Sequence, residues 1–160
     1  YNESIYKGTP VSVSNIFTDK RYSIISKEAF DIYAINHDID PMEYILSLDA
    51  YSYYMMNILD YLVGNTDRHW GNWGFLIDNN INEPISLHPL MDFNQAFNAY
   101  DSIEGANCQT TPISMTQKEA AIEAVKNIGL NQIQPINPSW FHNEQQKYEM
   151  FLKRLSILII

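Results

Sequence analysis

The chain has 160 residues, of which 46% are hydrophobic and 13% aromatic, and its formal net charge is −9. This composition excludes a disordered chain and predicts one domain over residues 1–160 with a sizeable core. The acidic balance argues against direct binding of nucleic acid. No apolar run reaches the roughly 18 residues that a membrane span needs, so no membrane partner is expected. The single cysteine, Cys108, excludes a disulfide framework and fits the cytoplasm.

The first part of the chain predicts little regular structure before one helix. Residues 1–22 mix β-branched and polar residues around Pro10, which is typical of irregular structure or short strands. A helix is expected to start after Ser26 and to include Phe30 and Ala34, which are spaced one helical turn apart.

The clearest helical pattern begins at Asp40-Pro41, where the aspartate can cap the helix and the proline suits its first position. Gly64 stands where a left-handed C-cap would fall. The sequence therefore predicts one helix of about 22 residues, roughly 33 Å long at 1.5 Å per residue. The apolar residues that recur at helical spacing are Ile45, Leu48, Tyr51, Met55, Ile58, Leu59 and Leu62.

A β-hairpin is predicted next, from the apolar runs 73–77 and 85–88 on either side of a turn-rich stretch. After a polar loop, Thr116 and Glu119 form a capping box that opens a helix stopped by a glycine. A final helix is expected from Asn137-Pro138, with Trp140 facing inward. The predicted fold class is mainly α with a small β-hairpin.

The polar loop between the long helix and the hairpin is the main candidate for function. Its sequence, Asn65-Thr66-Asp67-Arg68-His69-Trp70-Gly71-Asn72, places a carboxylate, an imidazole and a carboxamide at offsets of 0, +2 and +5. A second carboxylate, Asp92, follows the hairpin in Met91-Asp92-Phe93. Because a hairpin joins the two clusters, it can bring Asn72 and Asp92 near each other.

These residue types suit phosphoryl transfer from ATP. Magnesium prefers carboxylate, carbonyl and water oxygens, which Asn72 and Asp92 can supply. The reaction also needs a carboxylate that orients the acceptor hydroxyl and takes its proton. Asp67 is the candidate for this catalytic role, and Asn72 and Asp92 are the candidate metal ligands.

Each of these residues also has a purely structural interpretation. Asn-Thr-Asp after a helix-ending glycine is an ordinary turn sequence. Arg68 is expected either to contact phosphate or to be solvated, and His69 to fix the loop by a hydrogen bond rather than to bind metal. His88 is expected to be structural. Trp70 and Trp73 are expected to pack the loop onto the core.

The chain resembles the HipA-like serine/threonine kinases over about residues 40–98. The segment from Asp60 to Leu76, with the pattern N-T-D-x-H-x-x-N, looks like the catalytic loop of that family, and the segment from His88 to Asn94 resembles its metal-binding segment. The resemblance implies a protein-kinase-like C-terminal lobe. It also implies transfer of the ATP γ-phosphate to Ser or Thr of a protein substrate, with magnesium. Bacterial members include toxins, so an antitoxin protein is a possible partner.

By position, the resemblance makes Asp67 the catalytic base and Asn72 and Asp92 the magnesium ligands. Asn65, Arg68 and His69 belong to the supporting loop. The chain departs from the eukaryotic pattern at Asn94, where those kinases have glycine.

The larger departure is that the sequence has no Gly-rich loop and no strand lysine paired with a helical glutamate. In the family these parts belong to an N-terminal lobe. We therefore expect the chain to be a C-terminal lobe that needs its missing lobe as a partner, and to have little kinase activity alone. The ATP-contacting residues remain unassigned.

Three alternatives stay open. A phosphoinositide kinase shares Asp-Arg-His-x-x-Asn, but residues 94–109 contain no Lys or Arg that would favour an anionic lipid. A metal-dependent hydrolase would use Asp67, His69, His88 and Asp92 around zinc or manganese. A pseudokinase or protein-binding module would keep the scaffold without the chemistry.

Overall fold

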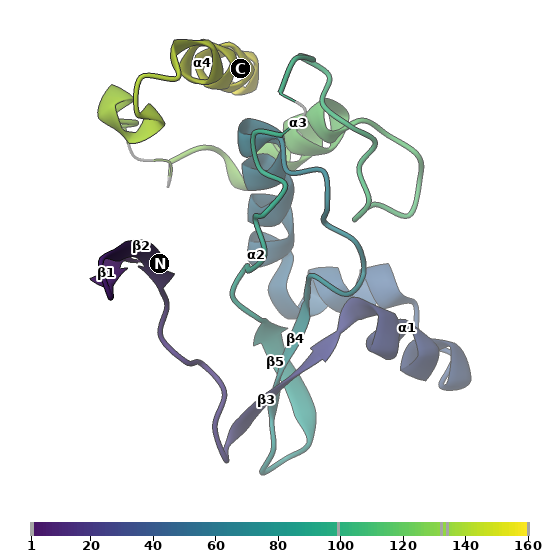
Figure 1. The fold of residues 1–160 in the computed structure, drawn as a ribbon. Helices are drawn as coiled ribbons and strands as arrows, with labels where there is room; N and C mark the ends of the chain where they lie inside the picture. Colours follow the sequence, from purple (N-terminus) through teal and green to yellow (C-terminus); the bar gives the residue numbers. More distant parts are fainter. Residues whose placement is uncertain (1, 99, 132, 134, 160) are drawn as a thin grey trace.

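The fold is mixed α and β (Figure 1). The computed structural model describes residues 2–98, 100–131, 133 and 135–159. Within these ranges the chain forms four α-helices and two small antiparallel sheets. The expectation of a mainly α fold with a small hairpin therefore underestimated the β structure, because the chain has a second hairpin and a third strand beside the predicted one.

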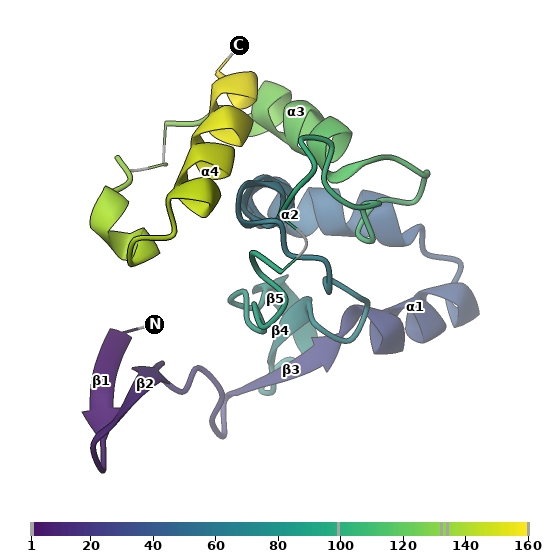
Figure 2. The ribbon, with the colours of Figure 1, turned by 45° about the horizontal axis from the view of Figure 1, so that its top comes forward.

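The first sheet is a hairpin of β1 (Asn2–Tyr6) and β2 (Thr9–Val13). Its turn is formed by Lys7 and Gly8, which both have positive φ, as a two-residue type I′ turn requires. All residues of both strands are exposed except Val11, which is half-buried. Figures 1 and 2 show this hairpin standing apart from the second sheet.

The second sheet has the order β3-β4-β5 and contains the predicted hairpin. Strands β4 (Gly74–Asp78) and β5 (Glu83–Leu87) form that hairpin, and β3 (Tyr22–Ser26) pairs with the other edge of β4. A Cβ on Gly74 would lie 2.1 Å from the Ile25 carbonyl oxygen, so only glycine permits this close pairing. No pattern in the sequence predicted β3.

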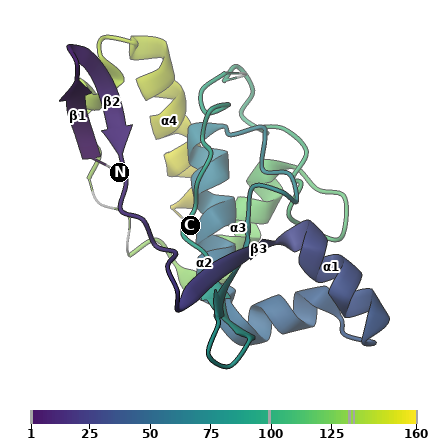
Figure 3. The same cartoon turned by 60° about the horizontal axis from the view of Figure 1, so that its bottom comes forward.

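The first two helices start where their capping residues predicted. The side chain of Ser26 caps α1 (Lys27–Asn36), and Asp40 caps α2 (Pro41–Val63) by accepting from two backbone amides. Gly64 ends α2 in the left-handed conformation, with φ 62° and ψ 40°. Figure 3 shows α1 and α2 meeting beside β3.

The long helix is not regular throughout, because Asp49 interrupts it with φ −155° and ψ 62°. The Asp49 carboxylate accepts from Ser52 N at 3.1 Å, which caps the second half of the helix, and from Leu87 N at 3.0 Å. Aspartate competes for backbone amides in this way, which the apolar periodicity did not reveal. The interruption ties α2 to the end of β5.

Two cores meet along α2. One joins α1, the first part of α2 and the β3–β5 sheet around Phe30, Met56 and Phe75. The other packs the last part of α2 against α3 (Gln117–Ile128) and α4 (Gln145–Leu158). The Thr116 capping box and the Gly129 stop of α3 are confirmed.

The final helix is shorter than predicted. Residues Pro138–Phe141 form a 3₁₀ turn, and His142 and Asn143 then adopt positive φ before α4 begins. Trp140 is 61% exposed, so the expectation that it faces inward was wrong. Among the described residues, no helix has the length and apolarity to cross a membrane.

Candidate active site

The loop from Asn65 to Asn72 starts from a helix end whose carbonyl groups all have partners. The last four carbonyl groups of a helix receive no hydrogen bond from within the helix, so their donors must come from other parts of the protein. Each of the last four carbonyls of α2 has a donor. Asn65 N donates to the Asp60 carbonyl, and Arg154 Nη1 donates to the Tyr61 carbonyl. The Tyr100 hydroxyl donates to the Leu62 carbonyl, and Phe97 N donates to the Val63 carbonyl. The loop therefore begins from a fixed point.

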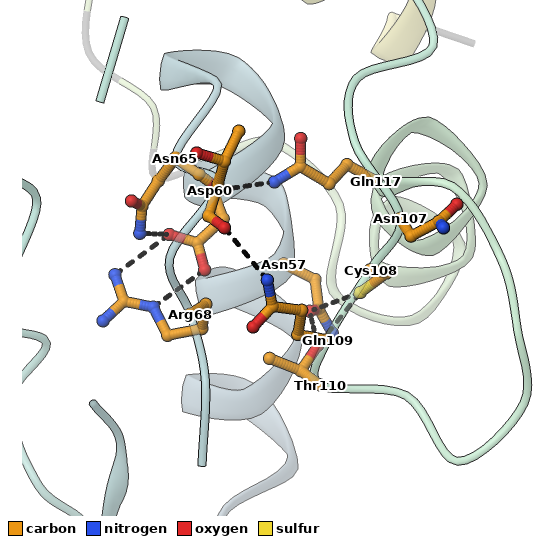
Figure 4. A pocket seen from close by; sticks show the side chains of 10 residues that line it. Asn57, Asp60, Asn65, Arg68, Asn107, Cys108, Gln109, Thr110 and Gln117 are labelled. Carbon is orange, nitrogen blue, oxygen red and sulfur yellow. Dashed lines mark hydrogen bonds and ion pairs between the residues drawn. The ribbon is translucent and has the colours of Figure 1, made fainter. Parts of the chain in front are cut away.

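A buried ion pair holds the first half of the loop. The Arg68 guanidinium binds the Asp60 carboxylate through Nε at 2.9 Å and Nη2 at 3.0 Å, and both residues are at least 96% buried. Asn65 donates to the same carboxylate at 3.0 Å and accepts from Asp67 N at 3.4 Å. Figure 4 shows Asp60 between Asn65 and Arg68.

Arg68 also joins the two polar segments. Its Nη1 donates to the carbonyl oxygen of Asn72 at 3.1 Å and to that of Met91 at 2.7 Å. The Phe93 ring lies 4.7 Å from the guanidinium carbon. The backbones on either side of the β4–β5 hairpin are thus bound to one nitrogen atom, which brings Asn72 next to the segment that bears Asp92.

The three predicted site residues differ in their surroundings. Asn72 is 9% exposed, and its Nδ2 donates to the Asp67 carbonyl at 2.8 Å, so its Oδ1 remains available as an acceptor. The Asp67 side chain is 38% exposed. Asp92 is exposed and has φ 56°, a left-handed conformation that Asp tolerates better than most residues and that is often found at functional sites.

The other loop residues have structural contacts that correct two expectations. Arg68 is neither solvated nor free to contact phosphate, because its guanidinium is occupied inside the protein. His69 Nδ1 accepts from Gly71 N at 3.0 Å, as expected for a residue that fixes the loop. Trp73 is buried, but Trp70 is 59% exposed and does not pack the loop onto the core.

The start of α1 supports the second half of the loop. Lys27 N donates to the Trp73 carbonyl at 2.9 Å, and Glu28 N donates to the Trp70 carbonyl at 3.2 Å. These amides are among the first of the helix and have no partner within it. One helix terminus and two loop carbonyls therefore satisfy each other.

Residues from a distant segment complete the loop's support, and sequence reasoning missed them. Gln117, at the start of α3, donates to the Asn65 carbonyl at 2.5 Å, and Gln109 donates to the Thr66 carbonyl at 2.9 Å. Figure 4 shows these side chains around a small cavity beside Asp60. Neither glutamine lies in a pattern that could have revealed its role. Asp60 did leave a signal, as a charge within the apolar run 58–63.

His88 has a structural environment. It is 4% exposed, its ring stacks on Phe17, and its Nδ1 lies 2.8 Å from the Pro89 carbonyl oxygen. Burial lowers the pKa of His88 below its usual value, and the positive charge of Arg68 lowers it further. Among the described residues, no group of three or more His, Cys, Asp or Glu side chains is placed so that it could hold a metal ion.

Comparison of the chain with protein-family models, with curated proteins and with solved structures gave no match.

Proposed function

We propose that these residues form the C-terminal catalytic lobe of a HipA-like kinase, which transfers the γ-phosphate of ATP to a Ser or Thr hydroxyl of a protein. One observation supports this best: the Nη1 of Arg68 binds the carbonyls of both Asn72 and Met91. This contact holds the backbone of Asn72 close to the backbone of the segment that bears Asp92, on a loop that also presents Asp67.

The donor groups fit a magnesium ion. The Nδ2 of Asn72 is used by the Asp67 carbonyl, so the free acceptor of this side chain is an oxygen, and Asp92 adds an exposed carboxylate. Oxygen donors of this kind suit Mg²⁺. When bound, the ion would neutralise charge on the ATP phosphates.

The remaining chemistry belongs to Asp67. The acceptor oxygen attacks the γ-phosphorus, the bond from that phosphorus to the bridging β–γ oxygen breaks, and ADP leaves. Asp67 orients the acceptor hydroxyl and takes its proton. Its half-exposed carboxylate is open to an incoming hydroxyl, and the bonds to Asn65 and Asn72 fix the backbone of Asp67.

The 160 residues contain no Gly-rich loop that could cover the ATP phosphates. We therefore propose that an N-terminal lobe outside these 160 residues covers the phosphates. Weak phosphate transfer is expected from these residues alone, and stronger transfer from the full-length protein that contains them.

The test replaces Asp67 by Asn in that full-length protein and measures transfer of labelled γ-phosphate to itself and to added proteins. We expect a loss of 10²- to 10⁴-fold, the usual contribution of a positioned base. Asp38→Asn, at an exposed position outside the loop, is the matched control and should keep full activity. Wild-type protein without transfer would favour the pseudokinase alternative, and unchanged transfer by the Asp67 variant would overturn the assignment of the base.

A further inference from the structure

An open pocket of about 490 Å³ lies next to the Asp67 loop and has no role in the phosphate transfer described above. Its walls come from α1, the start of α2, the loop residues Trp70 and Trp73, and the segment from Gln109 to Pro112. The volume lies within the range of pockets that bind small ligands or side chains.

Trp70 is the most unusual part of this pocket. Its side chain is 59% exposed, although the loop that bears it is well ordered by hydrogen bonds. The Trp70 carbonyl accepts from Glu28 N at 3.2 Å, so the exposure does not come from a loosely held backbone. A large aromatic side chain held in solvent is a typical anchor for a protein partner.

The opposite wall is also fixed in place. Gln109 donates to the Thr66 carbonyl at 2.9 Å, and the Tyr53 hydroxyl donates to the Thr110 carbonyl at 3.2 Å. The wall from Gln109 to Pro112 is therefore attached to the same loop that presents Asp67. A preformed pocket loses less entropy when it is filled.

The spacing matches a peptide that passes over Asp67. Trp70 follows Asp67 by three residues, so their Cα atoms are at most about 11 Å apart at 3.8 Å per step. An extended peptide advances about 3.3 Å per residue. A side chain two or three residues from a hydroxyl at Asp67 can therefore reach Trp70.

The chemistry of the lining favours an apolar side chain. The apolar residues that line the pocket are Ile35, Pro41, Met42, Trp70, Trp73 and Pro112. Its two carboxylates already have partners, since Asp31 is paired with Lys27 and Asp40 accepts from the amides of Met42 and Glu43. Lys27 also lines it, but its ammonium group is paired with Asp31 and is not free for an acidic segment. The net charge of −9 disfavours acidic segments further.

We propose that this pocket selects the acceptor protein by binding a large apolar side chain two or three residues from the phosphorylated Ser or Thr, against the indole of Trp70. This inference rests on the proposed kinase function and names the substrate class of the same site.

The experiment uses the full-length protein with a Ser/Thr-centred peptide library that varies each flanking position, and with a dephosphorylated cell extract whose new phosphosites are mapped. We expect Leu, Ile, Met or Phe to be preferred at least fivefold over Ala at one position two or three residues from the acceptor. Trp70→Ala should abolish this preference and raise the KM of the preferred peptide at least tenfold, with a smaller change in kcat. Trp70→Phe should restore most of the preference.

Trp140→Ala is the matched control, because Trp140 is equally exposed, at 61%, but lies on the 3₁₀ turn outside the pocket. It should keep the wild-type preference and KM. A Trp70→Ala enzyme with unchanged preference, or an equal loss in the Trp140 variant, would overturn the pocket and leave Asp67-dependent transfer standing. Wild-type protein that modifies neither peptides nor extract would overturn both proposals. Should Trp70→Ala fail to fold, Ile35→Asp, which places a charge in the same pocket at an exposed position, should abolish the preference, and an unchanged preference in that variant would overturn the pocket.

Discussion

Two buried arginines lie near the loop from Asn65 to Asn72, and their charges are stabilised differently. Arg154 binds the end of α2, from which the loop starts, and Arg68 binds the end of the loop itself. Arg68, 2% exposed, has a carboxylate partner in Asp60 and joins the loop from Asn65 to Asn72 to the Met91 segment. Arg154, fully buried, donates to the Tyr61 carbonyl at the end of α2 and to the Ser102 carbonyl. The rings of Tyr61 and Tyr100 lie within 5.1 Å and 4.4 Å of its guanidinium carbon.

The buried charge of Arg68 is balanced by a carboxylate, whereas the buried charge of Arg154 is not balanced by a carboxylate within hydrogen-bond distance among the described residues. Burial lowers the pKa of Arg154, which reflects the cost of an ion surrounded by dipoles and aromatic faces, and its Nε has no partner among the described residues. Its position at a helix C-terminus is nevertheless favourable for a cation. In contrast, removal of Asp60 would leave the Arg68 charge unbalanced inside the protein.

The largest effect on stability is expected from Asp60→Asn. Loss of one partner of a buried ion pair costs about 3–5 kcal/mol, because the remaining charge stays desolvated. Urea denaturation should show this drop in the free energy of unfolding, and Asp38→Asn should not. A double variant, Asp60→Leu with Arg68→Met, should recover part of the loss. An Asp60 variant as stable as the control would show that the pair does not hold the loop.

A smaller effect is expected from Arg154→Met. The change removes two hydrogen bonds from a charged donor, but it also removes a buried charge that lacks a carboxylate partner. We expect a loss of about 1–2 kcal/mol in the same denaturation experiment. Phosphate transfer per folded molecule should change much less than in Asp67→Asn, because Arg154 contacts the end of α2 and not the residues from Asn65 to Asn72. A loss larger than that of Asp60→Asn would reverse the comparison.

The smallest expected effect is a dependence of the free energy of unfolding on pH, which comes from His88 near Arg68. Folded His88 binds a proton less readily than unfolded His88, because burial and Arg68 lower its pKa. Its stabilising contribution is therefore complete above the unfolded pKa of about 6.5 and is lost as the pH falls below it. Unfolding measured from pH 8 to pH 5 should show a shallower decline in His88→Asn than in wild type. The exposed His142→Asn control should follow wild type, and identical slopes in all three would contradict the prediction.

Local patterns predicted most helix ends, because capping and stop signals act over a few residues. Ser26, Asp40, Gly64 and Thr116 each lie at the boundary where the sequence placed it. The interruption at Asp49 escaped prediction because the apolar spacing continues through it. Strand β3 escaped because its pairing depends on the close approach allowed by Gly74, about 50 residues later in the chain.

Sequence patterns identified the candidate site residues, but they did not identify the contacts that hold the loop in place. Asp67, Asn72 and Asp92 stood out because their order and the intervening hairpin are local features. The contacts that position them are not local: Gln109 and Gln117 lie more than 40 residues from the carbonyls they bind. The packing of the whole of α2 determines that Asp60 faces Arg68. The spacing of apolar residues along the helix does not reveal this orientation.

The double contact of Arg68 also limits how the chain can change length. The turn from Asn79 to Asn82 projects into solvent at the far end of the β4–β5 hairpin, where extra residues would leave both strands in register. Between His88 and Met91, one added residue would move the Met91 carbonyl away from the guanidinium. The tip of the hairpin is therefore the place where insertions can be absorbed, while the segment from His88 to Met91 has to keep its length.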